Sequence, residues 1–165
     1  MTKRPKCDKL IWNNDYMFCR GIAVYIKEYI TNSQTETENV GRELFSQLSY
    51  PAFVAMYGDL GAGKTAFVRG MVSSFDGDAV VTSPTYNIVN QYSFGDKNLY
   101  HFDMYRITDS DDLFSVGFYD YLDNGILVCE WCENIPDDIP ESYWRVTVTK
   151  CEEENARHIK VEFIE

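Results

Sequence analysis

One eight-residue segment constrains the fold of this chain more than any other feature, the run Gly58-Asp-Leu-Gly-Ala-Gly-Lys-Thr65. It satisfies the pattern G-x-x-x-x-G-K-[ST], in which glycines let the backbone curl until its N–H groups point inward at a phosphate. The residues before it, Ala52–Tyr57, are nearly all apolar, which is typical of a strand buried on both faces of a sheet. Apolar residues at helical spacing follow it to about Ser74. The order strand, glycine loop, helix predicts an α/β fold.

The rest of the chain supplies further strands and helices for a mixed sheet. Ser33 and Glu36 have the spacing of a capping box, in which each side chain accepts a hydrogen bond from the other residue's free backbone N–H, so a helix is expected to begin there. Gly95-Asp96 separates two β-rich runs, as in a hairpin. We expect strands at 22–30, 52–57, 88–94, 99–103, 126–129, 143–150 and 157–164, and helices at 35–49, 64–74 and 109–122, the last with a break at Gly117. These elements predict one α/β domain, in which a mixed, mostly parallel sheet is flanked by helices and extended by antiparallel hairpins.

The length of the chain, its N-terminal residues and its cysteines limit which classes of protein it can belong to. The chain has 165 residues, and a single domain usually has roughly 100 to 200. Residues 1–20 show no clear periodicity and are predicted to be an irregular extension before a domain of residues 21–165. No apolar run approaches the 18 or so residues of a membrane helix, and the basic N-terminus lacks the apolar segment of a secretory signal. Because the five cysteines are odd in number and widely spaced, a cytosolic protein with reduced thiols is expected.

Negative charge is concentrated in one stretch of the chain. The formal net charge is −11, and residues 103–138 contain ten carboxylates against one basic residue, Arg106. Such a surface repels phosphodiester backbones, so tight direct binding of nucleic acid is not expected. If the protein serves an RNA pathway, another protein is expected to hold the RNA. The acidic stretch itself is interpreted either as a solvated face or as a docking surface for a partner.

The glycine loop predicts a nucleotide site with two candidate acids. Lys64 is expected to reach the β- and γ-phosphates of a nucleotide, and the Thr65 hydroxyl to ligate Mg²⁺. Asp103 and Glu130 each end an apolar strand, and ligands of open α/β sheets bind at the carboxyl ends of the strands. One carboxylate is expected to ligate Mg²⁺ and the other to orient or deprotonate the attacking water, in either assignment. Because the guanine-specificity motif N-K-x-D is absent from the sequence, adenine is the favoured base.

Four motifs together resemble a known family. Gly58–Thr65, Ser83-Pro-Thr-Tyr86, His101-Phe-Asp-Met-Tyr-Arg106 and Glu130-Trp131 look, in this order and spacing, like the bacterial TsaE family, the ATPase of tRNA threonylcarbamoyladenosine biosynthesis. The match runs from about Ile22 to the C-terminus. The resemblance implies a small P-loop NTPase fold that binds Mg²⁺ and ATP and works with two partner proteins, TsaB and TsaD. It also implies that the partners contact the tRNA and that the ATPase resets the synthase between cycles.

The resemblance assigns roles to individual residues. It implies phosphate binding by Asp59, Leu60, Gly61, Ala62, Gly63, Lys64 and Thr65, Mg²⁺ binding by Thr65 and Glu130, and nucleotide contacts by Thr85, Trp131, Arg157, Gln34 and Thr37. Asp103 is similar to the family's Walker-B-like acid, so hydrolysis is expected to depend on Asp103, Glu130 and Lys64. Residues 83–85 match a mobile, switch-like segment near the γ-phosphate. Residues 1–20 and Cys132 depart from the family pattern and receive no family role.

Three further features leave alternatives open. Cys129-Glu-Trp-Cys132 has the spacing of a zinc half-site or redox pair, but no second paired spacing occurs, and Cys129 is interpreted as a small core residue. His101 points by strand alternation to the same face as Asp103, where it either tunes that carboxylate or is a hydrogen-bonded structural histidine. Arg106 is interpreted as an arginine finger in cis or, preferentially, as half of a salt bridge in the acidic stretch.

Two other functions share the same loop. A small-molecule or nucleotide kinase generally clamps its second substrate with arginines and lysines, and only seven of these follow Thr65. That scarcity favours an ATPase over a kinase. A nucleotide-dependent switch would use ATP binding to change residues 83–92 and thereby the affinity for a partner, which is compatible with the family resemblance.

Overall fold

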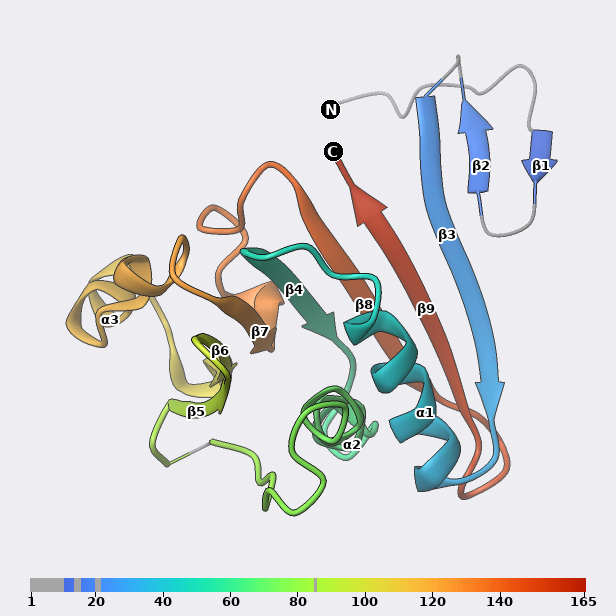
Figure 1. Ribbon diagram of the computed structural model, residues 1–165, viewed down its shortest axis with the longest axis horizontal. Coiled ribbons are helices and arrows are strands. Elements are labelled where there is room, and N and C mark those ends of the chain that lie inside the picture. Colours follow the sequence, from blue (N-terminus) through green and yellow to red (C-terminus); the bar gives the residue numbers. More distant parts are fainter. Residues whose placement is uncertain (1–10, 14–15, 20–21, 85) are drawn as a thin grey trace.

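The computed structural model describes residues 11–13, 16–19, 22–84 and 86–165, with side chains from Tyr25 onward (Figure 1). The described strands are β1 (Ile11–Asn13), β2 (Tyr16–Cys19), β3 (Ile22–Thr31), β4 (Ala52–Tyr57), β5 (Val89–Phe94), β6 (Lys97–Asp103), β7 (Ile126–Glu130), β8 (Tyr143–Lys150) and β9 (Arg157–Ile164). The described α-helices are α1 (Gln34–Phe45), α2 (Lys64–Val72) and α3 (Ser110–Ser115). Short 3-10 turns are η1 (Met104–Arg106), η2 (Phe118–Tyr121) and η3 (Cys132–Asn134).

All described strands belong to one mixed sheet, in the order β1-β2-β3-β9-β8-β4-β7-β6-β5. Its centre is parallel, because β4 pairs in parallel with both β8 and β7, and β7 pairs in parallel with β6. The other pairings are antiparallel: β5 with β6 at one edge, and β8, β9, β3, β2 and β1 in succession toward the other. The predicted α/β class is confirmed, and the antiparallel additions reach both edges of the sheet.

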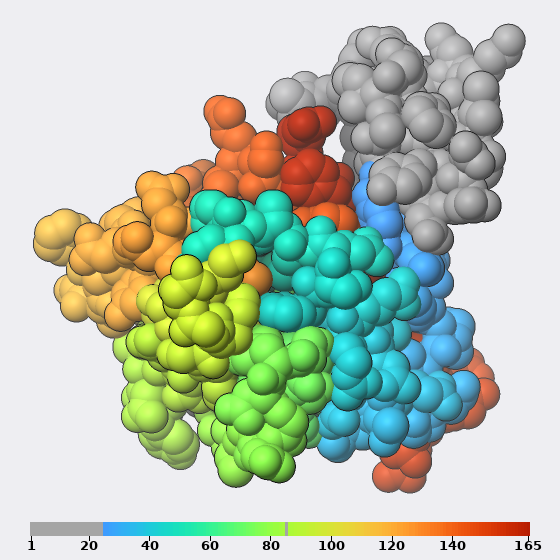
Figure 2. Space-filling model, in the orientation of Figure 1, coloured from blue at the N-terminus to red at the C-terminus, as the bar shows by residue number. Residues whose placement is uncertain are grey.

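Two layers of helices and turns cover the central strands. Along β4, Val54 and Met56 face the core that contains the apolar side chains of α1 and α2, whereas Phe53 and Ala55 face the core that contains α3 and η2. This alternation is why the strand reads as a continuous apolar run, since both of its faces are buried. Figure 1 shows α1 and α2 beside β4, β8 and β9, and both views place α3 at the side of the molecule away from β3 (Figures 1 and 2).

The start of α1 follows from its first residues, and its end differs from the prediction. The Ser33 hydroxyl accepts a hydrogen bond of 3.2 Å from Glu36 N, while Glu36 Oε2 accepts one of 2.8 Å from Asn32 N rather than from Ser33 N. The helix ends at Phe45, four residues before the predicted end. Tight backbone turns then follow, and Pro51 has no N–H to continue a helix.

The remaining elements mostly match the predictions. The two hairpins form as expected, with Gly95 at φ +62° in the turn between β5 and β6. The predicted helix over 109–122 is interrupted at Gly117, which has φ +68° and separates α3 from η2. The prediction of an irregular extension is wrong for β1 and β2, which form a hairpin on β3. The other residues of 1–20 lie outside the described residues, and the domain boundary after residue 20 stays a prediction.

α1 and α2 touch backbone to backbone. A Cβ atom on Gly41 of α1 would lie 2.1 Å from the Phe67 carbonyl oxygen, and one on Gly70 of α2 would lie 1.9 Å from the Glu38 carbonyl oxygen. Both distances are far inside van der Waals contact, so this packing requires glycine. An ion pair of 3.1 Å between Arg69 Nη1 and Glu38 Oε1 spans the same contact. α1 is therefore held directly against the helix that follows the glycine loop.

Among the described residues, no helix combines the length and the apolar character needed to cross a bilayer.

Candidate functional site

The glycine loop joins the carboxyl end of β4 to the start of α2. Gly58 has φ +135°, and a Cβ atom there would lie 2.2 Å from the Val148 carbonyl oxygen, so the position requires glycine. Gly63 has φ +111° and is the N-cap of α2, where it offers no side chain to bond the first turn. The N–H groups of that turn and the positive end of the helix dipole are thus available to an anion. This is the geometry in which helix N-termini bind phosphate.

A cavity of about 460 Å³ lies beside this loop. It is lined by residues 60–66 and by Gln34, Arg69, Ser83, Asp103, Tyr105, Glu130 and Trp131. Asp59 is not among the lining residues, although its carbonyl oxygen accepts a hydrogen bond of 3.2 Å from Lys64 Nζ. The structure therefore brings the predicted phosphate-binding residues from Leu60 to Thr65, both predicted acids and Trp131 around one space.

Lys64 is folded back onto its own loop. Its Nζ donates to the Gly58 carbonyl oxygen at 2.6 Å and lies 4.0 Å from the centre of the Trp131 ring. Burial lowers the pKa of the Lys64 ammonium, and the carboxylates of Glu130, Glu133, Asp103 and Asp59 oppose that shift. A buried cation held by neutral carbonyls and an aromatic face is well suited to exchange these partners for phosphate oxygens. Trp131 itself has φ +62°, an uncommon conformation for a bulky residue, next to this ammonium.

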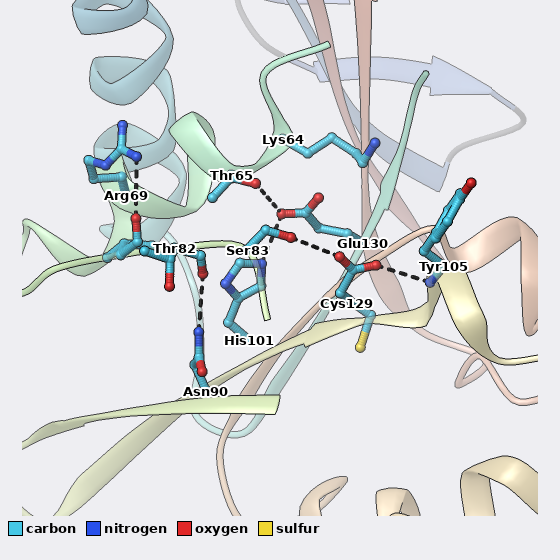
Figure 3. Close-up of polar contacts among 12 residues, drawn as sticks. Lys64, Thr65, Arg69, Thr82, Ser83, Asn90, His101, Tyr105, Cys129 and Glu130 are labelled. Atoms are coloured by element: carbon cyan, nitrogen blue, oxygen red, sulfur yellow. Dashed lines mark hydrogen bonds and ion pairs between the residues drawn. The ribbon is translucent and has the colours of Figure 1, made fainter. Parts of the chain in front are cut away.

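Glu130 is buried at the end of β7 and is held by two donors. Its Oε1 atom accepts a hydrogen bond of 2.9 Å from the Thr65 hydroxyl and lies 2.9 Å from His101 Nε2 (Figure 3). The hydroxyl and the carboxylate come from different segments, the start of α2 and the end of β7. Both are hard oxygen donors of the kind that Mg²⁺ prefers, so this pair fits a magnesium site.

Asp103 lies directly opposite Glu130, because the two residues are register partners in the parallel pair of β6 and β7. Its Oδ2 atom accepts a hydrogen bond of 2.8 Å from the Ser83 hydroxyl, and its Oδ1 atom accepts one of 3.0 Å from Tyr105 N. His101 shares this face, as predicted, but its hydrogen bond goes to Glu130 on the next strand. Diagonal neighbours on adjacent strands are within reach of a long side chain, which accounts for the choice of partner.

A second cavity, of about 240 Å³, lies next to the first. Its lining contains Gln34, Thr37 and Arg157, together with Gly61, Gly63, Ala66 and Asn155. Gln34 and part of the loop line both cavities. Arg157 Nε donates to the Ala62 carbonyl oxygen at 2.7 Å, which ties β9 to the loop. Gln34 and Thr37 of α1 and Arg157 of β9, which is distant from them in the sequence, are therefore gathered beside the glycine loop.

The other candidate residues lie elsewhere. Thr85 falls outside the described residues. Cys129 and Cys132 are buried, and Cys132 Sγ donates to the Cys129 carbonyl oxygen at 3.1 Å. Burial, with Cys132 beside it, raises the pKa of the Cys129 thiol. Cys129 is fully buried in the core that contains α3 and η2, which agrees with its interpretation as a small core residue. Arg106 lies 5.1 Å from the centre of the Tyr86 ring, and it makes no ion pair with a described carboxylate.

Tyr105 was not singled out from the sequence, although its backbone N–H binds the predicted acid. The signal was present, because an aspartate often accepts a hydrogen bond from the N–H two residues later at the start of a turn. Asp103 does so as the N-cap of η1. Sequence reasoning also missed the bond from Ser83 to Asp103, which joins residues that are 20 apart in the chain.

The chain is similar to known proteins in both sequence and fold. Residues 31–159 match the family described as threonylcarbamoyl adenosine biosynthesis protein TsaE. The tRNA threonylcarbamoyladenosine biosynthesis protein TsaE of Rickettsia typhi is 37% identical over 63% of this chain and 73% of its own length. That of Treponema pallidum is 31% identical over 73% of this chain and 87% of its own length. A crystal structure of Bacillus subtilis YdiB shares the fold, with a TM-score of 0.69 and 23% identity, and covers 86% of this chain and 88% of that one.

Proposed function

Because the chain belongs to the TsaE family, whose members act in the biosynthesis of threonylcarbamoyladenosine in tRNA, we propose that it is a Mg²⁺-dependent ATPase of that pathway. The observation that carries the proposal is the complete glycine loop, with Lys64 and Thr65, facing two strand-end carboxylates across one cavity. That combination supplies what phosphoryl chemistry needs, which is a cradle for the phosphates, an oxygen site for a cation and an acid near the attacking water.

The two adjoining cavities suggest how ATP lies. The triphosphate would occupy the loop, with Lys64 exchanging the Gly58 and Asp59 carbonyl oxygens for phosphate oxygens. The adenosine would occupy the smaller cavity, between Gln34 and Thr37 of α1 and Arg157 of β9. Gly61 and Gly63 line both spaces, so one continuous ligand can reach both.

The two carboxylates have different surroundings, and these suggest different roles. Thr65 and Glu130 would hold Mg²⁺, which neutralises charge on the β- and γ-phosphates when bound. Asp103 bonds to Ser83, in the segment that precedes β5, and would orient or deprotonate the attacking water. Ser83 thereby connects that segment to the acid on which hydrolysis would depend.

The partners are proposed from the family and from charge. We expect the chain to act in the cytosol with TsaB and TsaD, to reset the synthase through ATP turnover, and to meet tRNA only through them. The ten carboxylates of residues 103–138 make direct binding of a polyanion unfavourable. Several of them belong to α3 and its flanking turns, away from the two cavities, where they are available to a partner.

Nucleotide binding is tested by changing the loop lysine. Lys64→Ala is expected to weaken ATP binding at least tenfold in isothermal titration calorimetry, because one charged hydrogen bond contributes about 1.5–3 kcal/mol. Lys97→Ala is the matched control, since Lys97 is an exposed lysine of the β5–β6 hairpin that contacts Tyr50 rather than the cavity. Equal affinities for Lys64→Ala and the unmodified chain would refute the phosphate site.

Hydrolysis and the choice between ATPase and kinase are tested together. Phosphate release from ATP is measured for the chain alone and after addition of TsaB and TsaD, without any small-molecule acceptor. The proposal expects slow turnover alone and marked stimulation by the partners. Turnover that required an added acceptor would establish the kinase alternative. ATP-dependent association with the partners, without turnover, would establish a binding switch.

A further inference from the structure

His101 is the one buried histidine among the described residues, and the roles proposed so far leave it unassigned. It lies on β6, fully inaccessible to solvent, with Nε2 2.9 Å from Glu130 Oε1. Its other ring nitrogen, Nδ1, is also buried and has no hydrogen-bond partner. A buried polar atom without a partner is unfavourable by about 1–3 kcal/mol. The other interactions of the buried ring, among them the contact with Glu130, therefore outweigh this loss.

The unpartnered nitrogen indicates where the proton is. A proton on Nδ1 would leave a buried donor without an acceptor and would turn the Nε2 lone pair toward a carboxylate oxygen. A proton on Nε2 alone gives a hydrogen bond to Glu130 and leaves only an acceptor unsatisfied at Nδ1. The second arrangement avoids the repulsion, so a ring that carries hydrogen on Nε2 is the form that fits these surroundings.

Two donors then meet on one oxygen of Glu130. The Thr65 hydroxyl and His101 Nε2 both bond to Oε1, from opposite segments of the site. Figure 3 shows the second carboxylate oxygen turned toward the side on which Lys64 lies. With one oxygen held, rotation of the carboxylate about its last bond is restricted, and the second oxygen keeps a fixed direction into the cavity.

We propose that His101 is a positioning residue, which holds Glu130 in the orientation that binds Mg²⁺ with the nucleotide. The inference rests on the proposed function, because it concerns the same metal site. His101 touches neither nucleotide nor metal, and it acts through the Glu130 carboxylate. The matched variants are His101→Gln, which keeps an N–H donor of similar reach, and His101→Met, which has similar length and no donor.

The measured quantity is the ratio of two dissociation constants for a non-hydrolysable ATP analogue, in EDTA and in Mg²⁺. His101→Met is expected to reduce the stabilisation by Mg²⁺ about tenfold or more, since outer-shell partners of metal ligands typically contribute that much to metal affinity. The dissociation constant in EDTA is expected to stay within twofold, because the phosphate loop is unchanged. His101→Gln is expected to restore the ratio to within threefold of the unmodified chain.

A double-mutant cycle adds a stricter condition. In a Glu130→Ala background, His101→Met is expected to change the ratio no further, because the group through which it acts is gone. The inference is overturned if His101→Met keeps the unmodified ratio, or if it weakens binding equally in EDTA and in Mg²⁺, as a general disturbance of the cavity would. An unmodified chain that binds no nucleotide at all would refute the proposed function and this inference together.

A second test leaves His101 unchanged, so it does not depend on whether a His101 variant folds. The chain has only two histidines, so the ¹⁵N resonances of the imidazoles are readily assigned with a His158→Gln variant. We expect a hydrogen-bonded proton on Nε2 of His101. A hydrogen on Nδ1 and none on Nε2 would overturn the inference, because the ring would then donate nothing to Glu130.

Discussion

The contact between α1 and α2 predicts that replacing Gly70 by alanine destabilises the protein, whereas helix propensity alone predicts stabilisation. Gly70 lies in the interior of α2, where replacement of glycine by alanine usually stabilises a helix by about 1 kcal/mol. Here the added Cβ atom would lie 1.9 Å from the Glu38 carbonyl oxygen and 2.6 Å from its carbonyl carbon. These atoms belong to the backbone of α1, so they cannot move aside as the end of a side chain can. Relief requires the two helices to separate.

The net effect follows from the two opposing terms. Overpacking a tight contact costs up to about 3 kcal/mol, and the propensity gain offsets about 1 kcal/mol of it. Gly70→Ala is therefore expected to lower the free energy of unfolding by about 2 kcal/mol, which in a domain of this size lowers Tm by about 4–8 °C. Separation of the helices would also shift Gln34 and Thr37 relative to the glycine loop, because these residues line the smaller cavity on α1.

Thermal unfolding followed by circular dichroism measures the effect. The control is Gly77→Ala, since Gly77 is exposed and a Cβ atom there would meet nothing within 4 Å. That control is expected to remain within about 0.5 kcal/mol of the unmodified chain. A Tm for Gly70→Ala equal to or above that of the unmodified protein would refute the reasoning, because helix propensity would then have outweighed the backbone contact.

Two further predictions concern the helix cap and the buried thiols. Ser33→Ala removes the hydrogen bond from Glu36 N and is expected to lower the free energy of unfolding in urea by about 1 kcal/mol. The control Ser46→Ala, at the other end of α1, is expected to lower it by less than about 0.5 kcal/mol. Equal losses for the two variants would contradict the capping role of Ser33. In brief iodoacetamide labelling at pH 8, mass spectrometry is expected to detect alkylation of Cys151 well before that of Cys129, because Cys129 is buried and its pKa is raised by burial. Similar labelling rates for the two thiols in the folded protein would contradict this prediction and show that the end of β7 opens readily.

The parts of the fold that were predicted from sequence have strong local signals. β4, β8 and β9 occupy the expected ranges, because a continuous apolar run or a sustained β-rich pattern specifies each strand by itself. β1 and β2 were missed because strands of three and four residues are too short to show a periodicity. The end of α1 was placed too late, since Leu48 continues the helical spacing after the backbone has already turned.

The features of the candidate site also divide into those with a local sequence signal and those without one. Asp103 and Glu130 were found because each follows a strand signal, and the glycine loop was found because its spacing is specific. The hydrogen bond from His101 to Glu130 was missed because it depends on β6 lying beside β7 in one particular register. Strand alternation gives the face of a side chain, but a partner on another strand is a non-local property of the sheet.

The pairing of β6 with β7 also bears on how this chain can diverge in evolution. Asp103 and Glu130 share one rung of that pair, so their separation is set by main-chain hydrogen bonding. Tyr105, in the turn directly after Asp103, lines the site. The rest of the connection between the two strands, residues 107–124, packs on the opposite face of the sheet through Leu113 and Phe118. Insertions or substitutions in residues 107–124 can therefore accumulate without altering the distance between the two acids. The exposed carboxylates of this connection can therefore change from one sequence to another while the geometry of the two acids is inherited unchanged.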